Sequence, residues 1–84
     1  MKAKKKQTQA EQVAEFIENA GFITTKQAQS LHILSPNQII KLVKKQIDMM
    51  EMFAMTKERK RIKIHYTSKK AALGYIKFIG GSVI

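Results

Sequence analysis

The chain has 84 residues, no cysteine, and a formal net charge of +10 from 16 lysines and arginines against six acidic residues. A chain of this length can bury one modest core, which leaves no room for a separate catalytic module. The absence of cysteine excludes disulfides and thiolate metal sites. The apolar runs are too short for a signal peptide or a membrane span, so we expect a cytoplasmic protein without membrane contact.

The large excess of positive charge indicates a polyanionic partner. Three of the six acidic residues, Glu11, Glu15 and Glu18, come early, and none lies between Asn19 and Ile47. A charged surface that served solubility alone would more often mix both signs. We therefore expect a dipolar molecule whose basic face comes from the middle and the carboxy-terminal half of the chain.

The predicted domain covers residues 8–79, between a flexible basic arm of residues 1–7 and a flexible apolar tail of residues 80–84. Disorder is the simplest expectation for the arm, and contact with a phosphate or a DNA groove is the alternative. The tail either packs back on the domain or crosses to a second copy. The basic residues of the arm are Lys2, Lys4, Lys5 and Lys6.

A first helix is predicted by apolar residues at the spacing i, i+3, i+4, i+7, and Gly21 is its expected end. The next residues, Phe22–Thr24, form a short extended link that can add a small strand beside a later hairpin. The apolar positions of this helix are Val13, Phe16, Ile17 and Ala20.

The stretch from Ile23 to Gln46 predicts two short helices joined by a tight turn, and it contains no acidic residue. The turn falls at His32–Ser35. Ser35 and Pro36 then open the second helix as N-cap and first-turn proline. Two short helices around such a turn are typical of proteins that read DNA.

On the second of these helices, two amides and three lysines fall within an arc of about 120°. Apolar residues occupy the remainder and allow that side to dock on a core. Amides can pair bidentately with adenine in a major groove, and lysines can reach guanine edges or phosphates. An ordinary amphipathic helix with a solvated face is the alternative. The residues in the arc are Asn37, Gln38, Lys41, Lys44 and Lys45.

After Ile47 the pattern predicts a hairpin with strands over Met49–Thr56 and Arg61–Tyr66. In the second strand apolar and basic residues alternate, which is the period of a half-buried strand with a basic outer face at Arg61, Lys63 and His65. The link at 57–60 lacks Gly and Asn, so a loose four-residue loop is expected instead of a tight primed turn.

Four methionines cluster at the first strand of the hairpin. Core filler beneath the hairpin is the simplest interpretation, and an adaptable protein-binding surface is the alternative. These residues are Met49, Met50, Met52 and Met55.

Ser68 is expected to cap a last helix that Gly80 and Gly81 end. Gly74 weakens this helix by about 1 kcal/mol relative to Ala. Tyr75 and Phe78 make it the expected place for contact with a second copy of the chain.

The segments GFITTKQAQSL, SPNQIIKLVKK and KRIKIHY, in this order, resemble small winged helix-turn-helix DNA-binding proteins of phages, prophages and plasmids. The resemblance covers residues 8–79. It implies an α+β, mainly α fold with a three-helix core, a two-stranded hairpin wing and a C-terminal helix. Two features depart from the family: His32 stands where Gly is usual, and the Gly that often precedes the wing is missing at Gln46–Met49.

In such families the second of the paired helices lies in the major groove and the wing contacts the flanking backbone or minor groove. Base reading is then expected from Asn37, Gln38 and Lys41. Contacts with the DNA backbone are expected from Thr25, Lys26, Gln27, Ser35, Lys44 and Lys45. The basic residues of the wing are Lys57, Arg59, Lys60, Arg61 and Lys63.

Other chemistry finds little support in the sequence. His32 and His65 are the only histidines and stand far apart, so we expect no metal site, and no catalytic motif or cofactor-binding motif appears. The expected function is binding of double-stranded DNA by a nucleoid-associated regulator of transcription or of a mobile element. Two alternatives stay open: a nonspecific DNA or RNA binder, and a small protein-interaction module or inhibitor built on the same fold.

Overall fold

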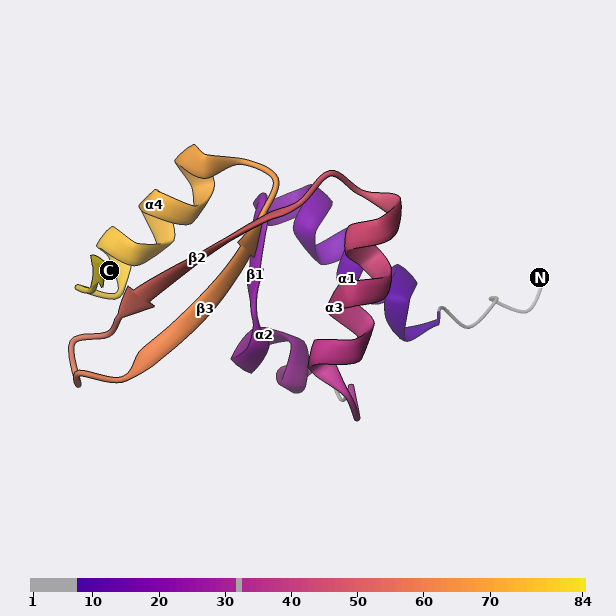
Figure 1. Cartoon of the computed structure of the whole chain (residues 1–84), viewed down its shortest axis with the longest axis horizontal. Coiled ribbons are helices and arrows are strands. Elements are labelled where there is room, and N and C mark those ends of the chain that lie inside the picture. The colour runs from indigo at the N-terminus through magenta and orange to yellow at the C-terminus, as the bar shows by residue number, and fades with distance from the viewer. Residues whose placement is uncertain (1–7, 32) are drawn as a thin grey trace, which may run out of the picture.

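The computed structural model describes residues 8–31 and 33–84, so the predicted arm of residues 1–7 and the turn residue His32 lie outside the described residues. The described part is a small α+β fold, about half helical (Figure 1). Its elements are, in order, α1 (Gln9–Ala20), β1 (Phe22–Thr24), α2 (Thr25–Ser30), α3 (Pro36–Gln46), β2 (Met50–Met55), β3 (Arg61–Tyr66), α4 (Lys69–Phe78) and β4 (Ser82–Val83).

The four strands form one antiparallel sheet in the order β1-β3-β2-β4. The hairpin of β2 and β3 is its centre, with Glu51 opposite His65 and Phe53 opposite Lys63. The short link after α1 pairs with β3, where Ile23 lies opposite His65. The predicted addition of a small strand beside the hairpin is thus confirmed.

At the starts of α1, α2 and α3, the residues with an extended backbone make a capping hydrogen bond and the residue with a smaller ψ angle does not. Thr8 and Thr24 have ψ of 164° and 161°, and each forms a capping box with the side chain three residues later. Ser35 has ψ of 74°, and its side chain makes no capping hydrogen bond. Ser35 therefore occupies the predicted N-cap position of α3 but does not cap it, and only Pro36 acts as expected.

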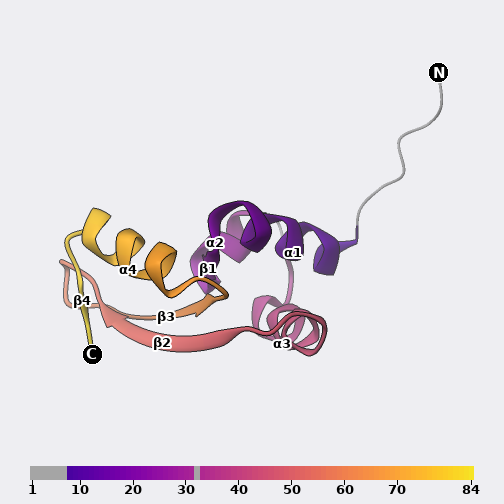
Figure 2. The same cartoon turned by 90° about the horizontal axis from the view of Figure 1, so that it is seen from above.

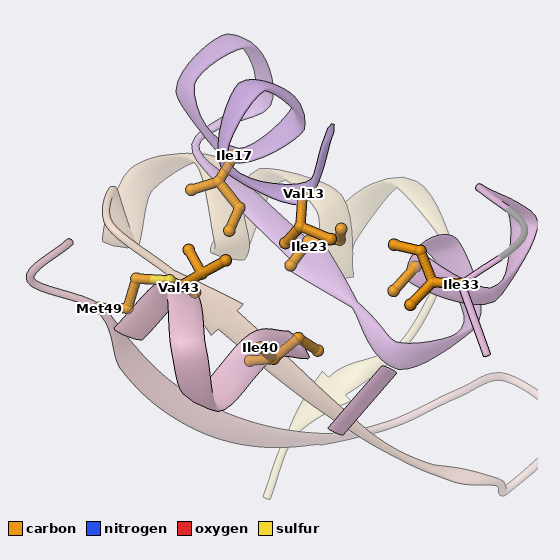
Figure 3. Packing of buried hydrophobic residues seen from close by; sticks show 8 residues of the cluster. Val13, Ile17, Ile23, Ile33, Ile40, Val43 and Met49 are labelled. Carbon is orange, nitrogen blue, oxygen red and sulfur yellow. The ribbon is translucent and has the colours of Figure 1, made fainter. Parts of the chain in front are cut away.

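The first hydrophobic cluster joins α1, β1, α2 and α3, and Figure 3 shows its side chains converging between the helices. Its members that are almost completely buried include Val13 and Ile17 of α1 and Ile40 and Val43 of α3. Burying a side chain of this size contributes about 1.5 to 3 kcal/mol. The buried residues of the cluster are Val13, Ile17, Ile23, Ala28, Ile33, Ile40, Val43 and Met49.

A second, smaller cluster lies between α4 and one face of the hairpin. Ala72 and Ile76 of α4 pack there with Ala54 and Ile64 of the sheet. Ser68 caps α4 as expected, because its Oγ accepts a hydrogen bond from the backbone N–H of Ala71. Since α4 covers this face of the hairpin, the opposite face is turned toward α3 or toward solvent.

Some apolar residues do not lie where the pattern indicated. Leu42 of α3 is 50% exposed. Of the four methionines that we assigned to one core, Met49 enters the first cluster and Met52 packs partly against the second, whereas Met50 is 53% exposed. Met50 and Met52 lie on one face of β2 and Met55 lies on the other, while Met49 precedes the strand, so the four methionines cannot fill one core.

The hairpin loop is shorter than the predicted four residues. The backbone N–H of Thr56 donates to the carbonyl of Lys60, which leaves the three residues 57–59 as the loop, and the N–H of Arg59 closes a turn on the carbonyl of Thr56. Arg59 takes the left-handed conformation, with φ of 64°. This is the three-residue loop in which the last position usually holds Gly, so an arginine here is strained.

The carboxy-terminal end folds back onto the sheet, which is one of the two placements that we expected for the tail. β4 pairs with the end of β2, with Val83 opposite Ala54. Gly80 has φ of 73°, and a Cβ on Gly81 would lie 2.5 Å from the carbonyl oxygen of Met55. The two glycines therefore allow both the reversal after α4 and the close approach of the chain to β2.

Candidate nucleic-acid interface

Helix α3 presents its polar side away from the first hydrophobic cluster. Ile40 and Val43 anchor the helix, and one polar side runs along its exposed surface. Asn37, Gln38 and Lys41 are exposed on it. The three predicted base-reading residues thus lie on an exposed helix side.

The open face of the hairpin lies on the same side of the molecule as α3. Figure 2 shows α3 and β2 along one side, with α1, α2 and α4 on the other. The side chains of Arg61 and Lys63 belong to this open face, since their neighbours Ile62 and Ile64 pack toward α4. The helix and the wing named from the sequence therefore contribute to one surface.

A cleft of about 240 Å³ lies between α3 and the hairpin. Asn37 and Lys41 line it from the helix, and Lys63 lines it from β3. The structure therefore brings two predicted base-reading residues and one predicted wing residue to a single site. The described residues that line the cleft are Asn37, Ile40, Lys41, Glu51, Lys63 and His65.

A second hollow, of about 350 Å³, continues this surface toward the start of α2. Thr25 and Lys26, both predicted backbone contacts, line it together with Arg61 and Lys63. Since Lys63 lines both hollows, the residues of α2, α3 and the hairpin form a continuous basic surface.

Other predicted contacts are placed differently. Gln27 is half-buried, and its side-chain oxygen accepts a hydrogen bond from the backbone N–H of Thr24, 3.0 Å away, so only its NH₂ group can turn outward. Ser35 is exposed at the start of α3, and Lys45 is exposed near its end. The tip of the hairpin carries exposed cations outside the cleft, namely Lys57, Arg59 and Lys60.

Glu51 is a site residue that the sequence reasoning missed. Its carboxylate lies 2.6 Å from Nζ of Lys44 and 3.6 Å from Nζ of Lys63. The hydrogen bond from Lys44 holds the pKa of the Glu51 carboxyl below its ordinary value. The predicted hairpin alone places Glu51 beside β3. Its contact with Lys44 depends on how α3 packs against the hairpin, and no sequence pattern indicates that packing.

His65 was expected on a basic outer face and is instead buried, with 4% exposure. It lies on the predicted strand face, but α3 and β1 cover that end of the sheet. Neither ring nitrogen has a hydrogen-bond partner among the described residues, and Nδ1 lies 3.7 Å from the Glu51 carboxylate. Burial lowers the pKa of His65 to about 4, outweighing the opposite effect of Glu51.

Phe53 lies on the open face of the hairpin and is 40% exposed. The guanidinium of Arg61 lies 4.7 Å from the centre of its ring, and Nζ of Lys63 lies 5.3 Å from it. Cations over an aromatic ring stabilise the pair across neighbouring strands. An exposed aromatic ring therefore stands within the basic surface.

The two residues proposed for contact between copies of the chain differ in accessibility. Tyr75 is half-buried, and its ring centre lies 4.7 Å from that of Phe22. Phe78 is 87% exposed. Tyr75 therefore serves mainly the packing of α4 on the sheet, and Phe78 is the residue left for an external contact.

Among residues 8–31 and 33–84, no three His, Asp or Glu side chains lie close enough together to hold a metal ion. In the same residues, no helix has the length and apolar character needed to cross a bilayer. No family model, curated protein or solved structure matches the chain.

Proposed function

We propose that this chain is a winged helix-turn-helix protein that binds double-stranded DNA in a sequence-specific manner, as a nucleoid-associated regulator of transcription or of a mobile element. In this proposal α3 enters the major groove and the hairpin of β2 and β3 is the wing. Asn37, Gln38 and Lys41 contact base edges, and the wing contacts the flanking backbone.

The observation that carries the proposal is the shared cleft, in which Asn37 and Lys41 of α3 face Lys63 of β3. A helix that reads bases needs phosphate contacts beside it to fix its register on the duplex, and Lys26 and Arg61 line the adjoining hollow. The element order supports the same arrangement, and the ion pair between Lys44 of α3 and Glu51 of β2 joins this helix to the hairpin.

Binding of this kind has a defined dependence on salt. Lysines and arginines that neutralise phosphates release condensed counterions, so affinity falls as the salt concentration rises. If about five phosphates are contacted, log affinity falls with log salt at a slope near −4.5. The amides of Asn37 and Gln38 contribute little to this slope, because they are uncharged.

The test compares two classes of variant on a preferred duplex and on a scrambled duplex. Asn37→Ala and Gln38→Ala should reduce affinity for the preferred duplex by about 1 to 3 kcal/mol each and leave affinity for the scramble almost unchanged. Arg59→Gly, which keeps the positive φ, should weaken binding to both duplexes alike and reduce the salt slope by about one. Equal effects of all three variants on both duplexes would refute the assignment of base reading to α3.

Paired binding through α4 is part of the same proposal. One domain of this size reads few base pairs, and dimers gain specificity by binding two half-sites. Phe78 is the exposed residue that would meet a second copy. Sedimentation of the protein with a duplex of two half-sites should show two chains per duplex.

A second candidate, binding of single-stranded nucleic acid, draws on Phe53. Bases stack on exposed aromatic rings in basic grooves, and Phe53 offers such a ring between Arg61 and Lys63. A single-stranded oligonucleotide of equal length therefore belongs in every titration. If it binds more tightly than the preferred duplex, the second candidate replaces the first.

A further inference from the structure

Among the residues that the structure describes, Glu51 is the only carboxylate that lines the cleft between α3 and the hairpin. It stands on β2 and contacts basic groups on two other elements: Lys44 of α3, and Lys63 and His65 of β3. The charge of two ammonium groups is thus partly neutralised within the surface that we propose to bind DNA.

The contact with Lys44 is the strongest of the three. At 2.6 Å it is a charge-assisted hydrogen bond, and both side chains are about one third exposed. Because Lys44 also lowers the pKa of the Glu51 carboxyl, this group is ionised at neutral pH. Lys63 reaches the other carboxylate oxygen at 3.6 Å, so one carboxylate restrains a lysine of the helix and a lysine of the wing.

We infer that Glu51 is a positioning residue that sets sequence discrimination, an inference that rests on the proposed function. A free lysine binds any phosphate and strengthens binding to every duplex. In the specific complex, Lys44 and Lys63 stay bound to Glu51 and hold α3 at a fixed position beside the wing. In a nonspecific complex, a phosphate can bind Lys44 or Lys63 only after it has displaced the Glu51 carboxylate. Glu51 therefore weakens binding to DNA of arbitrary sequence.

Glu51→Gln tests this inference, because the amide keeps the shape of the side chain and removes its charge. Affinity for a scrambled duplex should rise on the order of tenfold at physiological salt, and its salt slope should steepen by about 0.9 for each released lysine. Affinity for the preferred duplex should not rise, because α3 loses the contacts that hold it beside the wing. The ratio between the two affinities should therefore fall.

Two controls separate this effect from net charge and from folding. Glu18→Gln removes the same charge from an exposed position on α1, which is not among the residues that line the cleft, and should leave the affinity ratio unchanged. In a Lys44→Gln/Lys63→Gln background, Glu51→Gln should change nonspecific affinity less than twofold. Thermal unfolding of each variant establishes that it is folded.

The outcomes distinguish this inference from the proposed function. If the unchanged protein prefers no duplex, the proposed function fails. If it prefers one duplex but Glu51→Gln keeps the same affinity ratio, the inference about Glu51 is overturned. The inference is also overturned if Glu18→Gln lowers the ratio as much, or if Glu51→Gln still tightens nonspecific binding when both lysines are absent.

Discussion

Acid should destabilise the folded protein through His65. Burial lowers the pKa of this histidine from 6.5 to about 4, and neither ring nitrogen is hydrogen-bonded to the described residues. Between these two values the unfolded chain binds a proton that the folded chain does not, so stability falls as the pH is lowered. With these pKa values, the loss between pH 8 and pH 5 is about 2 kcal/mol, or about 8 to 16 °C in Tm.

The measurement is urea unfolding at pH 8 and pH 5, followed by circular dichroism because the chain has no tryptophan. The control is His65→Leu, which fills a similar volume and cannot titrate. At pH 8 the variant should match or exceed the stability of the unchanged protein, since it removes two unpaired buried nitrogens. If the variant loses as much stability between the two pH values as the unchanged protein, His65 is not the cause.

Further predictions concern backbone positions. Gly21→Ala should cost more than about 2 kcal/mol, because φ is 83° and the new Cβ would lie 2.7 Å from Cβ of Ala71. Gly74→Ala is its control: no atom of residues 8–31 or 33–84 lies within 4 Å of the added Cβ, so stability in urea unfolding should rise by about 1 kcal/mol. A loss of stability would contradict the helical account of α4. Arg59→Gly should raise the unfolding free energy by about 0.5 to 1 kcal/mol, because glycine adopts a positive φ without strain. Lys60→Gly, the control, should lower the unfolding free energy. If Arg59→Gly is less stable than the unchanged protein, the loop is not strained at Arg59.

Local signals predicted the elements well. Three signals each depend only on residues close together in the sequence. They are the apolar spacing before Gly21, the proline at position 36 that begins α3, and the alternation from Arg61 to Tyr66. For this reason the element order and the small strand beside the hairpin could be predicted without any knowledge of the packing. The exposure of Asn37, Gln38 and Lys41 followed from helical periodicity alone.

Features that depend on distant contacts were missed. The strand at Ser82–Val83 forms because the glycine pair returns the chain to β2, and its two residues carry no strand pattern of their own. His65 looked like a surface residue because alternation identifies a strand face but not what covers it. Glu51 acquires its role only once α3 and β3 are packed around it.

Selection of bound sequences from a random duplex pool tests the central claim most directly. The winning duplex is then titrated at physiological salt against a scrambled duplex and a single strand of equal length. We predict an enriched motif that binds at least about a thousandfold more tightly than the scramble. Equal, steeply salt-dependent binding to every sequence would contradict base reading by α3, and absence of binding to any nucleic acid would contradict the DNA-binding proposal as a whole.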